Sequence, residues 1–310
     1  MNETWTWHEP EQQIKLSVPL EFSFAQNLNY LADAAGECLY RIQDNALYKA
    51  LPIGKRLYVV KIYEDPESPR MLAISFLGGT YPASPSERNA VAAYVRDWFD
   101  LNADLGPFYE MAERDRLLKA TVNAYYGLRS MGIPDLFEAI CWGILGQQIN
   151  LSFAFTLKRR LVETYGKSVT AEGETYHVFP APETIAALSV PEMEDLRMTV
   201  KKREYLIGVA KLFMEGELSK EALLQMEDHQ KIEKKLVGIR GIGPWTANYV
   251  LMRCLRIPTA FPIDDVGLHN AVKHALGMEQ KPTRQELLKL AAGWKNWESY
   301  ATFYLWRLLY

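Results

Sequence analysis

Three glycines within six residues, Gly238, Gly241 and Gly243, place the strongest constraint on this chain. Apolar residues at helical spacing run up to Val237 and begin again after Pro244, so the glycines must turn the chain between two helices. Glycine accepts positive φ and allows close approach of a ligand, and proline suits a first helical turn. The free amides of that turn favour a phosphate. The pattern therefore fits either a plain helix connection or a hairpin that grips a nucleic-acid backbone.

Two adjacent carboxylates, Asp264 and Asp265, follow the second helix of this pair. They precede Val266-Gly-Leu-His, where helical spacing resumes, so we expect one of them to cap a third helix. A capping carboxylate can also face a cleft, and the two roles do not exclude each other.

The hairpin and the aspartate together resemble a known family. The run from Gly241 to Tyr249, with Asp265 twenty positions after Trp245, is similar to the helix-hairpin-helix (HhH-GPD) DNA glycosylase superfamily. Within it, the chain resembles the 3-methyladenine DNA glycosylase II (AlkA) type. Residues 137–150 and 294–306 are similar to that group's DNA-facing helix and C-terminal helix.

Residues 1–111 read as an α+β domain. β-branched and aromatic segments separated by turn residues predict an antiparallel sheet, and helical spacing predicts two helices. The resemblance implies a small sheet similar to one repeat of the TATA-binding protein fold. We expect strands at 13–18, 38–42, 57–63 and 71–76, and helices at 24–35 and 86–99.

Residues 112–310 are helical in periodicity almost throughout. The resemblance implies an all-α, two-lobed helix-hairpin-helix body. One lobe is expected at 136–257, with the hairpin at 238–244. The other joins 112–135 to 258–310.

The resemblance gives Asp265 the catalytic role, with Asp264 as the local alternative. A carboxylate beside C1′ of a sugar stabilises the oxocarbenium charge that forms when an N-glycosidic bond breaks, and can help to orient water. An alkylated purine is itself cationic and is attracted by aromatic faces. Trp245, Tyr249 and Trp306 match the family's pocket rings, and Tyr30 matches a ring from the N-terminal domain. Each ring, taken without the resemblance, fits a hydrophobic core better than a pocket, because large aromatic residues dominate cores.

A damaged base must be rotated out of the duplex before its glycosidic bond can be reached. Gln148 matches the family's wedge, which fills the gap left by that base, although a polar residue on a helix face fits the sequence as well. The hairpin contacts to DNA are expected from Gly238, Gly241, Gly243 and Thr246.

The residue at the lyase position predicts the reaction type. Family members that also cut the strand use a lysine two residues after the last hairpin glycine to form a Schiff base. That position is Trp245 here. The chain is therefore expected to release the base and leave the strand intact.

The net charge of −3 and the pI near 6.0 exclude a broadly basic surface. We expect a focused contact with double-stranded DNA, although short basic runs also fit solvated helix faces. The basic residues are concentrated at 158–160, 201–203 and 234–235.

Three cysteines, odd in number and far apart, favour neither a disulfide framework nor a zinc site. No cysteine follows Cys254, so the four-cysteine iron–sulfur cluster of some relatives is expected to be absent. The five histidines lack ligand spacing, and no cofactor is expected. The resemblance allows a structural monovalent or divalent cation on the backbone of Gly238 and Gly243.

Without a signal peptide or a membrane-length apolar run, the chain is expected to be a cytoplasmic monomer, associated with the nucleoid if bacterial. The main hypothesis is a monofunctional DNA glycosylase for alkylated purines in base excision repair. A glycosylase for oxidised or deaminated purines and a non-catalytic DNA-binding protein are the alternatives. Val266 stands where some relatives have tyrosine, which leaves the preferred base open.

Overall fold

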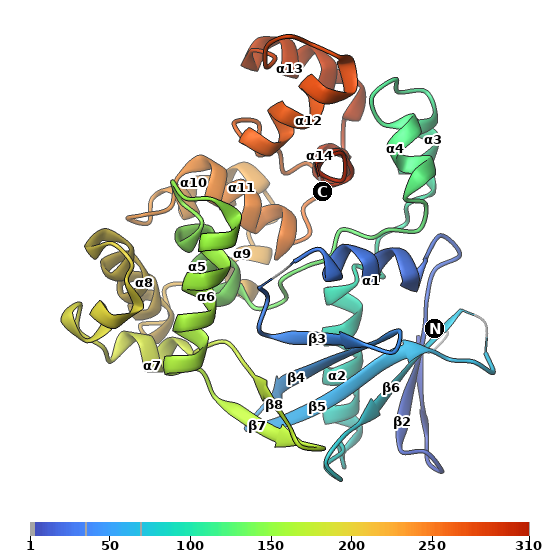
Figure 1. The fold of residues 1–310 in the computed structure, drawn as a ribbon, viewed down its shortest axis with the longest axis vertical. Coiled ribbons are helices and arrows are strands. Elements are labelled where there is room, and N and C mark those ends of the chain that lie inside the picture. Colours follow the sequence, from blue (N-terminus) through green and yellow to red (C-terminus); the bar gives the residue numbers. More distant parts are fainter. Residues whose placement is uncertain (1–3, 35, 69, 310) are drawn as a thin grey trace. The chain divides into compact units, whose positions relative to one another are not determined.

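The computed structural model describes residues 4–34, 36–68 and 70–309 (Figure 1). The chain forms two compact units, and each is built from more than one stretch of sequence. Unit 1 contains Met1–Asn102, Gly127–Arg129 and Gln148–Met198, and unit 2 contains Ala103–Tyr126, Ser130–Gln147 and Thr199–Tyr310.

Unit 1 is built on a six-stranded antiparallel sheet with the strand order β1-β2-β6-β5-β4-β3. Two-residue turns join several neighbouring strands. Asp44 and Asn45 both have positive φ between β3 and β4, a conformation that Asp and Asn tolerate better than other non-glycine residues. The strands are β1 (Trp5–His8), β2 (Gln13–Ser17), β3 (Tyr40–Gln43), β4 (Ala46–Ile53), β5 (Arg56–Glu64) and β6 (Met71–Phe76).

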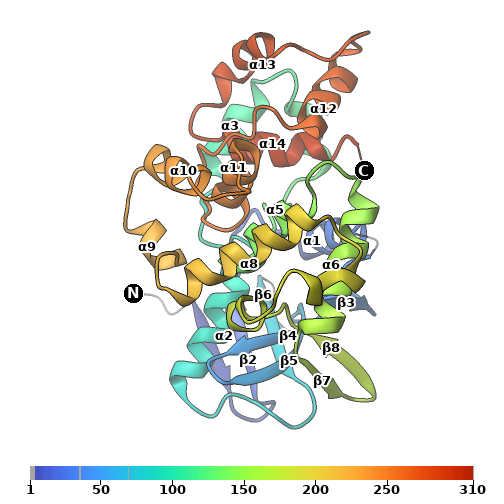
Figure 2. The ribbon, with the colours of Figure 1, turned by 90° about the vertical axis from the view of Figure 1, so that its left-hand side faces the viewer.

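Helices and a second hairpin complete unit 1. They are α1 (Phe24–Ala32), α2 (Pro85–Trp98), α6 (Leu151–Tyr165), β7 (Ser168–Ala171), β8 (Glu174–His177), α7 (Pro182–Ala186) and the 3₁₀ helix η1 (Pro191–Leu196). Helix α2 lies on one face of the sheet, and the β7–β8 hairpin lies on the other (Figures 1 and 2). Strand β4 is therefore buried on both faces.

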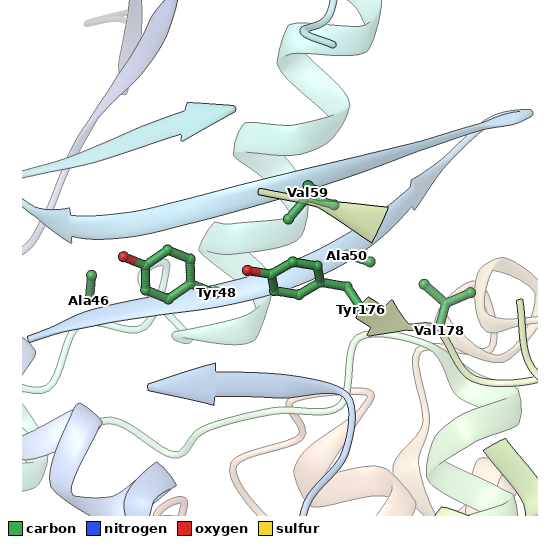
Figure 3. Packing of buried hydrophobic residues seen from close by; sticks show 7 residues of the cluster. Ala46, Tyr48, Ala50, Val59, Tyr176 and Val178 are labelled. Carbon is green, nitrogen blue, oxygen red and sulfur yellow. The ribbon is translucent and has the colours of Figure 1, made fainter. Parts of the chain in front are cut away.

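The hairpin side of the sheet forms a small hydrophobic core (Figure 3). Ala46, Tyr48 and Ala50 alternate along β4 toward Tyr176 of β8 and Val178 just beyond it. These side chains exclude water from this face, as expected for alternate residues of a strand.

A buried ion pair ties α6 to the sheet side of unit 1. The Lys158 ammonium lies 2.9 Å from the Glu37 carboxylate, and their side chains are only 4% and 11% exposed. Burial alone would raise the pKa of Glu37, but the charge of Lys158 and the N–H of Leu39 outweigh it and hold that pKa below its ordinary value.

Unit 2 is helical throughout its described residues. Helix α5 packs against α8 and α11, α10 packs against α11, and α14 packs against α12 and α4. The helices are α3 (Gly106–Glu113), α4 (Lys119–Ala124), α5 (Leu136–Leu145), α8 (Val200–Met214), α9 (Lys220–Leu224), α10 (His229–Val237), α11 (Pro244–Arg253), α12 (Val266–Leu276), α13 (Arg284–Ala291), the 3₁₀ helix η2 (Ala292–Trp294) and α14 (Glu298–Trp306).

The expected fold class is confirmed: an antiparallel N-terminal sheet precedes a helical body. All four expected strands and both expected helices are present, within a few residues at their ends, except that position 35 lies outside the described residues. Strands β1 and β4 and the β7–β8 hairpin were not expected. Strand β4 was missed because its two buried faces remove the alternation of apolar and polar residues.

The compact units divide the chain differently from the domains expected at 1–111 and 112–310. Residues 148–198 group with the sheet, because the β7–β8 hairpin packs on it and Lys158 pairs with Glu37. The division into domains and lobes thus stays a prediction. None of the described helices is both long and apolar enough to cross a membrane.

Replacing Glu37 with Gln would leave the Lys158 ammonium buried without its counter-charge. We expect E37Q to lower the free energy of unfolding by about 3–5 kcal/mol at pH 7. Because the folded-state pKa of Glu37 is depressed, the stabilisation is present above the ordinary pKa of about 4.3 and is lost as the pH falls through the folded value. Urea denaturation at pH 7 and at about pH 3 should therefore show a smaller difference between the two proteins at the lower pH.

The control is the double variant E37L/K158M, which removes both charges. It should be more stable than E37Q at pH 7, because no buried charge is left unpaired. Equal stability of E37Q and the wild type would contradict this role of the ion pair.

Candidate active site

The glycine hairpin lies where the sequence predicts it. Helix α10 ends at Val237, and α11 begins at Pro244. Gly241 has φ +97°, and a Cβ there would lie 2.4 Å from Cγ of Tyr205, so only glycine fits this position. The Gln147 side chain donates from Nε2 to the carbonyl oxygen of Gly241 at 2.8 Å. The turn is thus fixed from inside unit 2.

Gly243 differs from Gly241, because it is the N-cap of α11 and has φ −91°. No side chain caps this helix end, and a Cβ at Gly243 would meet nothing within 4 Å. The start of α11 is therefore open to an anion, which the helix dipole favours.

Asp265 caps α12, as expected for one of the two aspartates. Its Oδ1 accepts the Leu268 N–H at 2.6 Å and the Trp306 indole N–H at 2.8 Å. Its Oδ2 accepts the Trp245 indole N–H at 2.8 Å. The residue is only 9% exposed. Three N–H groups thus hold this mostly buried carboxylate in place.

The two carboxylate oxygens are not equivalent. Oδ1 already accepts two hydrogen bonds, whereas one is identified at Oδ2. A carboxylate oxygen commonly accepts two, so Oδ2 is the atom that can face a developing cation or a water molecule. The low local dielectric strengthens its interaction with a positive charge.

Three aromatic rings lie beside this carboxylate. Trp245 and Tyr249, one turn apart on α11, stack with centroids 5.3 Å apart and an interplanar angle of 24°. Trp306 of α14 lies 6.5 Å from Tyr249. Tyr249 is 6% exposed, whereas Trp245 and Trp306 are partly exposed. The two tryptophans each expose part of a ring to solvent, and Tyr249 packs against the ring of Trp245.

Asp264 is directed differently. Its side chain is 61% exposed and forms a surface ion pair with Arg284 at 3.2 Å. A solvated carboxylate interacts only weakly with other charges. The geometry therefore favours Asp265 over Asp264 as the functional carboxylate.

The DNA contact expected at Thr246 stays a prediction, and the structure excludes only a contact through its side chain. Thr246 is 2% exposed, and its Cγ2 packs so closely on α5 that a Cβ at Gly143 would lie 2.5 Å from it. The side chain is used to join α5 to α11 and is out of reach of a ligand.

Two of the three basic runs are only partly available at the surface, because each contains a buried lysine. Lys158 is buried in its ion pair, and Lys202 is buried with Nζ donating to the Leu145 carbonyl at 2.8 Å. Burial lowers the pKa of Lys202. Lys234 and Lys235, at the end of α10 beside the hairpin, are exposed.

Gln148 and Tyr30 belong to unit 1, so the wedge role of Gln148 and the pocket role of Tyr30 stay predictions. Gln148 is exposed and has φ +57°, an uncommon conformation for a residue other than glycine. Tyr30 is half-buried on α1. A strained, exposed residue is compatible with the wedge role.

Several supporting residues were missed from the sequence. Gly267 is one: a Cβ there would lie 2.9 Å from Oδ1 of Asp265 and 3.3 Å from Nε1 of Trp306. His269 is another, with its ring nitrogens 2.8 Å from the carbonyl oxygens of Pro282 and Ile263, so that it braces the loop before Asp265. A glycine two residues after the aspartate could have been noticed in the sequence as a position that needs a small residue. The partners of His269 could not have been predicted from the sequence.

The cysteines and acidic residues form no further reactive centre within the part of the chain that the structure covers. No group of three or more His, Cys, Asp or Glu side chains there could hold a metal ion. Cys38, Cys141 and Cys254 form no disulfide bond. Burial raises the pKa of the Cys141 thiol well above its ordinary value, which makes it a poor nucleophile.

Two family models match the chain. Residues 141–297 match the HhH-GPD superfamily base excision DNA repair protein, and residues 19–140 match the 8-oxoguanine DNA glycosylase, N-terminal domain.

Known relatives cover nearly the whole chain. A DNA-3-methyladenine glycosylase of Bacillus subtilis (strain 168) is 50% identical over 305 residues, which span 98% of this chain and 100% of the relative. DNA-3-methyladenine glycosylase 2 of Escherichia coli (strain K12) is 28% identical, over 92% of this chain and 93% of the relative. The solved 3-methyladenine DNA-glycosylase from Archaeoglobus fulgidus has the same fold, with a TM-score of 0.80 at 22% identity over 94% of this chain and 96% of that one.

The fold is that of a helix-hairpin-helix DNA repair protein, and the chain belongs to the HhH-GPD superfamily of base excision DNA repair proteins. Within this superfamily it is homologous to the AlkA type, as the sequence motifs predict.

Gly267→Ala tests how closely the carboxylate and the indole must approach. The φ of Gly267 is not positive, so the substitution acts only through the clash of its Cβ with Asp265 and Trp306. We expect base excision to slow by about 100-fold, since a shift of about 1 Å in a catalytic group has that effect. Single-turnover rates and thermal unfolding would be measured together.

Gly208→Ala is the matched control. Gly208 lies within α8, and a Cβ there would meet nothing within 4 Å. Both variants gain about 1 kcal/mol of helix propensity. Unchanged activity in G267A, or an equal loss in G208A, would contradict the steric account.

Proposed function

We propose that this chain is a monofunctional DNA glycosylase, which flips a damaged nucleotide out of double-stranded DNA and hydrolyses the N-glycosidic bond of an alkylated purine. The observation that carries this proposal is the Asp265 carboxylate, held by the indole N–H groups of two partly exposed tryptophans. The 50% identity to a relative named DNA-3-methyladenine glycosylase supports the substrate class.

The chemistry follows from the charge of Asp265. As the glycosidic bond lengthens, positive charge develops on the sugar, and a fixed carboxylate stabilises it without having to reorganise. Oδ2 also has the free acceptor capacity to orient the attacking water. Because three N–H groups hold the carboxylate in a fixed position, electrostatic stabilisation of the sugar cation is its main contribution.

The aromatic rings select the base. Purines alkylated at N3 or N7, such as 3-methyladenine and 7-methylguanine, carry positive charge, and an indole face attracts a cation more strongly than it attracts a neutral ring. Trp245 and Trp306 supply such faces, and Tyr249 holds Trp245 in its stacked position. We assign Tyr30 to the same pocket on the family resemblance.

DNA is held through its phosphates. Gly241 and Gly243 keep side chains away from the turn, and the uncapped start of α11 offers backbone N–H groups. Gly238, the C-cap of α10, belongs to the same turn. Lys234 and Lys235 place positive charge beside it. Gln148 would fill the space of the flipped nucleotide.

The absence of strand cleavage is inferred from Trp245. It occupies the position from which a lysine would attack the sugar, and an indole cannot form a Schiff base. Its N–H is instead directed to Asp265. We further propose a cytoplasmic monomer that needs no catalytic cofactor, with a structural cation on the backbone of Gly238 and Gly243 as an accessory to phosphate binding.

The proposal is tested by base release from methylated duplex DNA. We expect Asp265→Asn to lower single-turnover release by at least about 100-fold, because an amide cannot stabilise the sugar cation. Asp264→Asn is the matched control and should retain nearly full activity, since its side chain points to solvent. Strand breaks should appear only after heating in alkali.

Three results would contradict the proposal. Release from DNA with oxidised or deaminated purines but not from methylated DNA would change the substrate class. DNA binding without release of any base would indicate a binding protein. Strand breaks before alkali would reveal a lyase nucleophile.

A pair of glycine variants tests the hairpin. Gly243→Ala should fold normally but bind duplex DNA about tenfold more weakly, because its methyl group occupies the open surface that faces the phosphate. Gly241→Ala should instead lower the unfolding temperature, because its Cβ would overlap Tyr205 and its φ is +97°. Fluorescence anisotropy and thermal unfolding separate the two effects, and unchanged DNA affinity in G243A would remove the hairpin from the interface.

A further inference from the structure

We propose that Asp265 has a second role: its carboxylate assembles the aromatic pocket by holding Trp245 and Trp306 in position. This inference rests on the proposed function of the same site, because it concerns the pocket assigned there to the base. It adds that base binding and bond cleavage depend on one carboxylate.

The two indoles come from different helices. Trp245 lies at the start of α11, and Trp306 is the last residue of α14. Each donates its Nε1–H to a different oxygen of Asp265 at 2.8 Å. A hydrogen bond to an ionised acceptor is about twice as strong as a neutral one. Asp265 thus joins α11 and α14 through their ring-bearing side chains.

The carboxylate can restrain the rings because it is itself restrained. As the N-cap of α12 it accepts the Leu268 N–H at 2.6 Å, and Gly267 leaves room for the Trp306 indole at its side. Without such a restraint, a tryptophan side chain can populate several rotamers. One rotamer of each ring satisfies the hydrogen bond.

Tyr249 extends the restraint. It stacks on Trp245 at 5.3 Å and lies 6.5 Å from Trp306, so both tryptophans contact a ring that is itself buried. Stacking leaves a ring free to slide in its own plane. The hydrogen bonds from the indole N–H groups to Asp265 prevent this sliding and so fix the position of each ring edge.

This arrangement changes the effect expected of the Asp265→Asn substitution. The amide keeps one oxygen, which can still accept from one indole. Its NH₂ group is a donor and cannot accept from the second indole, so two N–H donors would face each other. One tryptophan must therefore turn away. The variant loses the pocket geometry as well as the catalytic charge, whereas a purely electrostatic role predicts loss of the charge alone.

The test observes the indole N–H groups directly and needs no substrate. ¹⁵N-labelled protein would be compared as wild type, D265N and D264N, with W245F and W306F to assign the two Nε1–H signals. We expect hydrogen exchange at one or both of these groups to accelerate about tenfold or more in D265N. D264N removes the neighbouring charge without touching either indole and should leave both signals in place.

Kinetics provide the second measurement. Phenylalanine keeps an aromatic face but lacks the N–H, so W306F should raise KM for methylated duplex several-fold while kcat falls less. Loss of ring area alone contributes to that change, so the exchange data decide the role of the hydrogen bond.

Exchange rates in D265N within about twofold of the wild type would overturn the second role of Asp265. This failure can be told apart from failure of the proposed function. A protein that releases no base from methylated DNA contradicts the glycosylase assignment, whereas the indole exchange still shows whether Asp265 positions the rings.

Discussion

A buried carboxylate with three N–H donors is the interaction on which the site depends. Leu268 supplies a backbone donor, and Trp245 and Trp306 supply side-chain donors, so α12, α11 and α14 meet at Asp265. A charge in a low dielectric is tolerated only when hydrogen bonds or an opposite charge compensate it, and these three bonds offset its desolvation. The helix cap, the pocket and the electrostatic centre are one structural unit, which explains why a glycine is needed two residues later.

Local features of the site could be predicted from the sequence, because they depend on neighbouring residues. The glycine turn, the start of α11 at Pro244 and the capping by Asp265 all follow from residue type and spacing. The partners of the carboxylate could not be predicted in this way. Trp306 lies far along the chain, and nothing in its own segment distinguishes a ring that donates to Asp265 from a ring in the core.

The fold shows the same division. Strands with one solvated face were found, whereas β4 was missed because it is buried on both faces and contains Lys49 and Pro52. The β7–β8 hairpin was missed although Glu172 and Gly173, both with positive φ, form the kind of two-residue turn that a sequence can indicate. The availability of the basic residues was predicted only in part, for another reason. Charge density is visible in a sequence, but the burial of Lys158 and Lys202 is decided by tertiary packing.

The β7–β8 hairpin, which covers one face of the main sheet, has a consequence for the order in which the chain can fold. All six strands of the main sheet lie within the first 76 residues, but β7 and β8, which cover one face of it, come only after α6. During synthesis from the N-terminus, Ala46, Tyr48 and Ala50 therefore stay exposed to water until the hairpin has left the ribosome. Closing this core requires contacts between distant parts of the sequence, which slows folding. The nascent sheet thus passes through a period in which its apolar face can associate with a chaperone or with another chain.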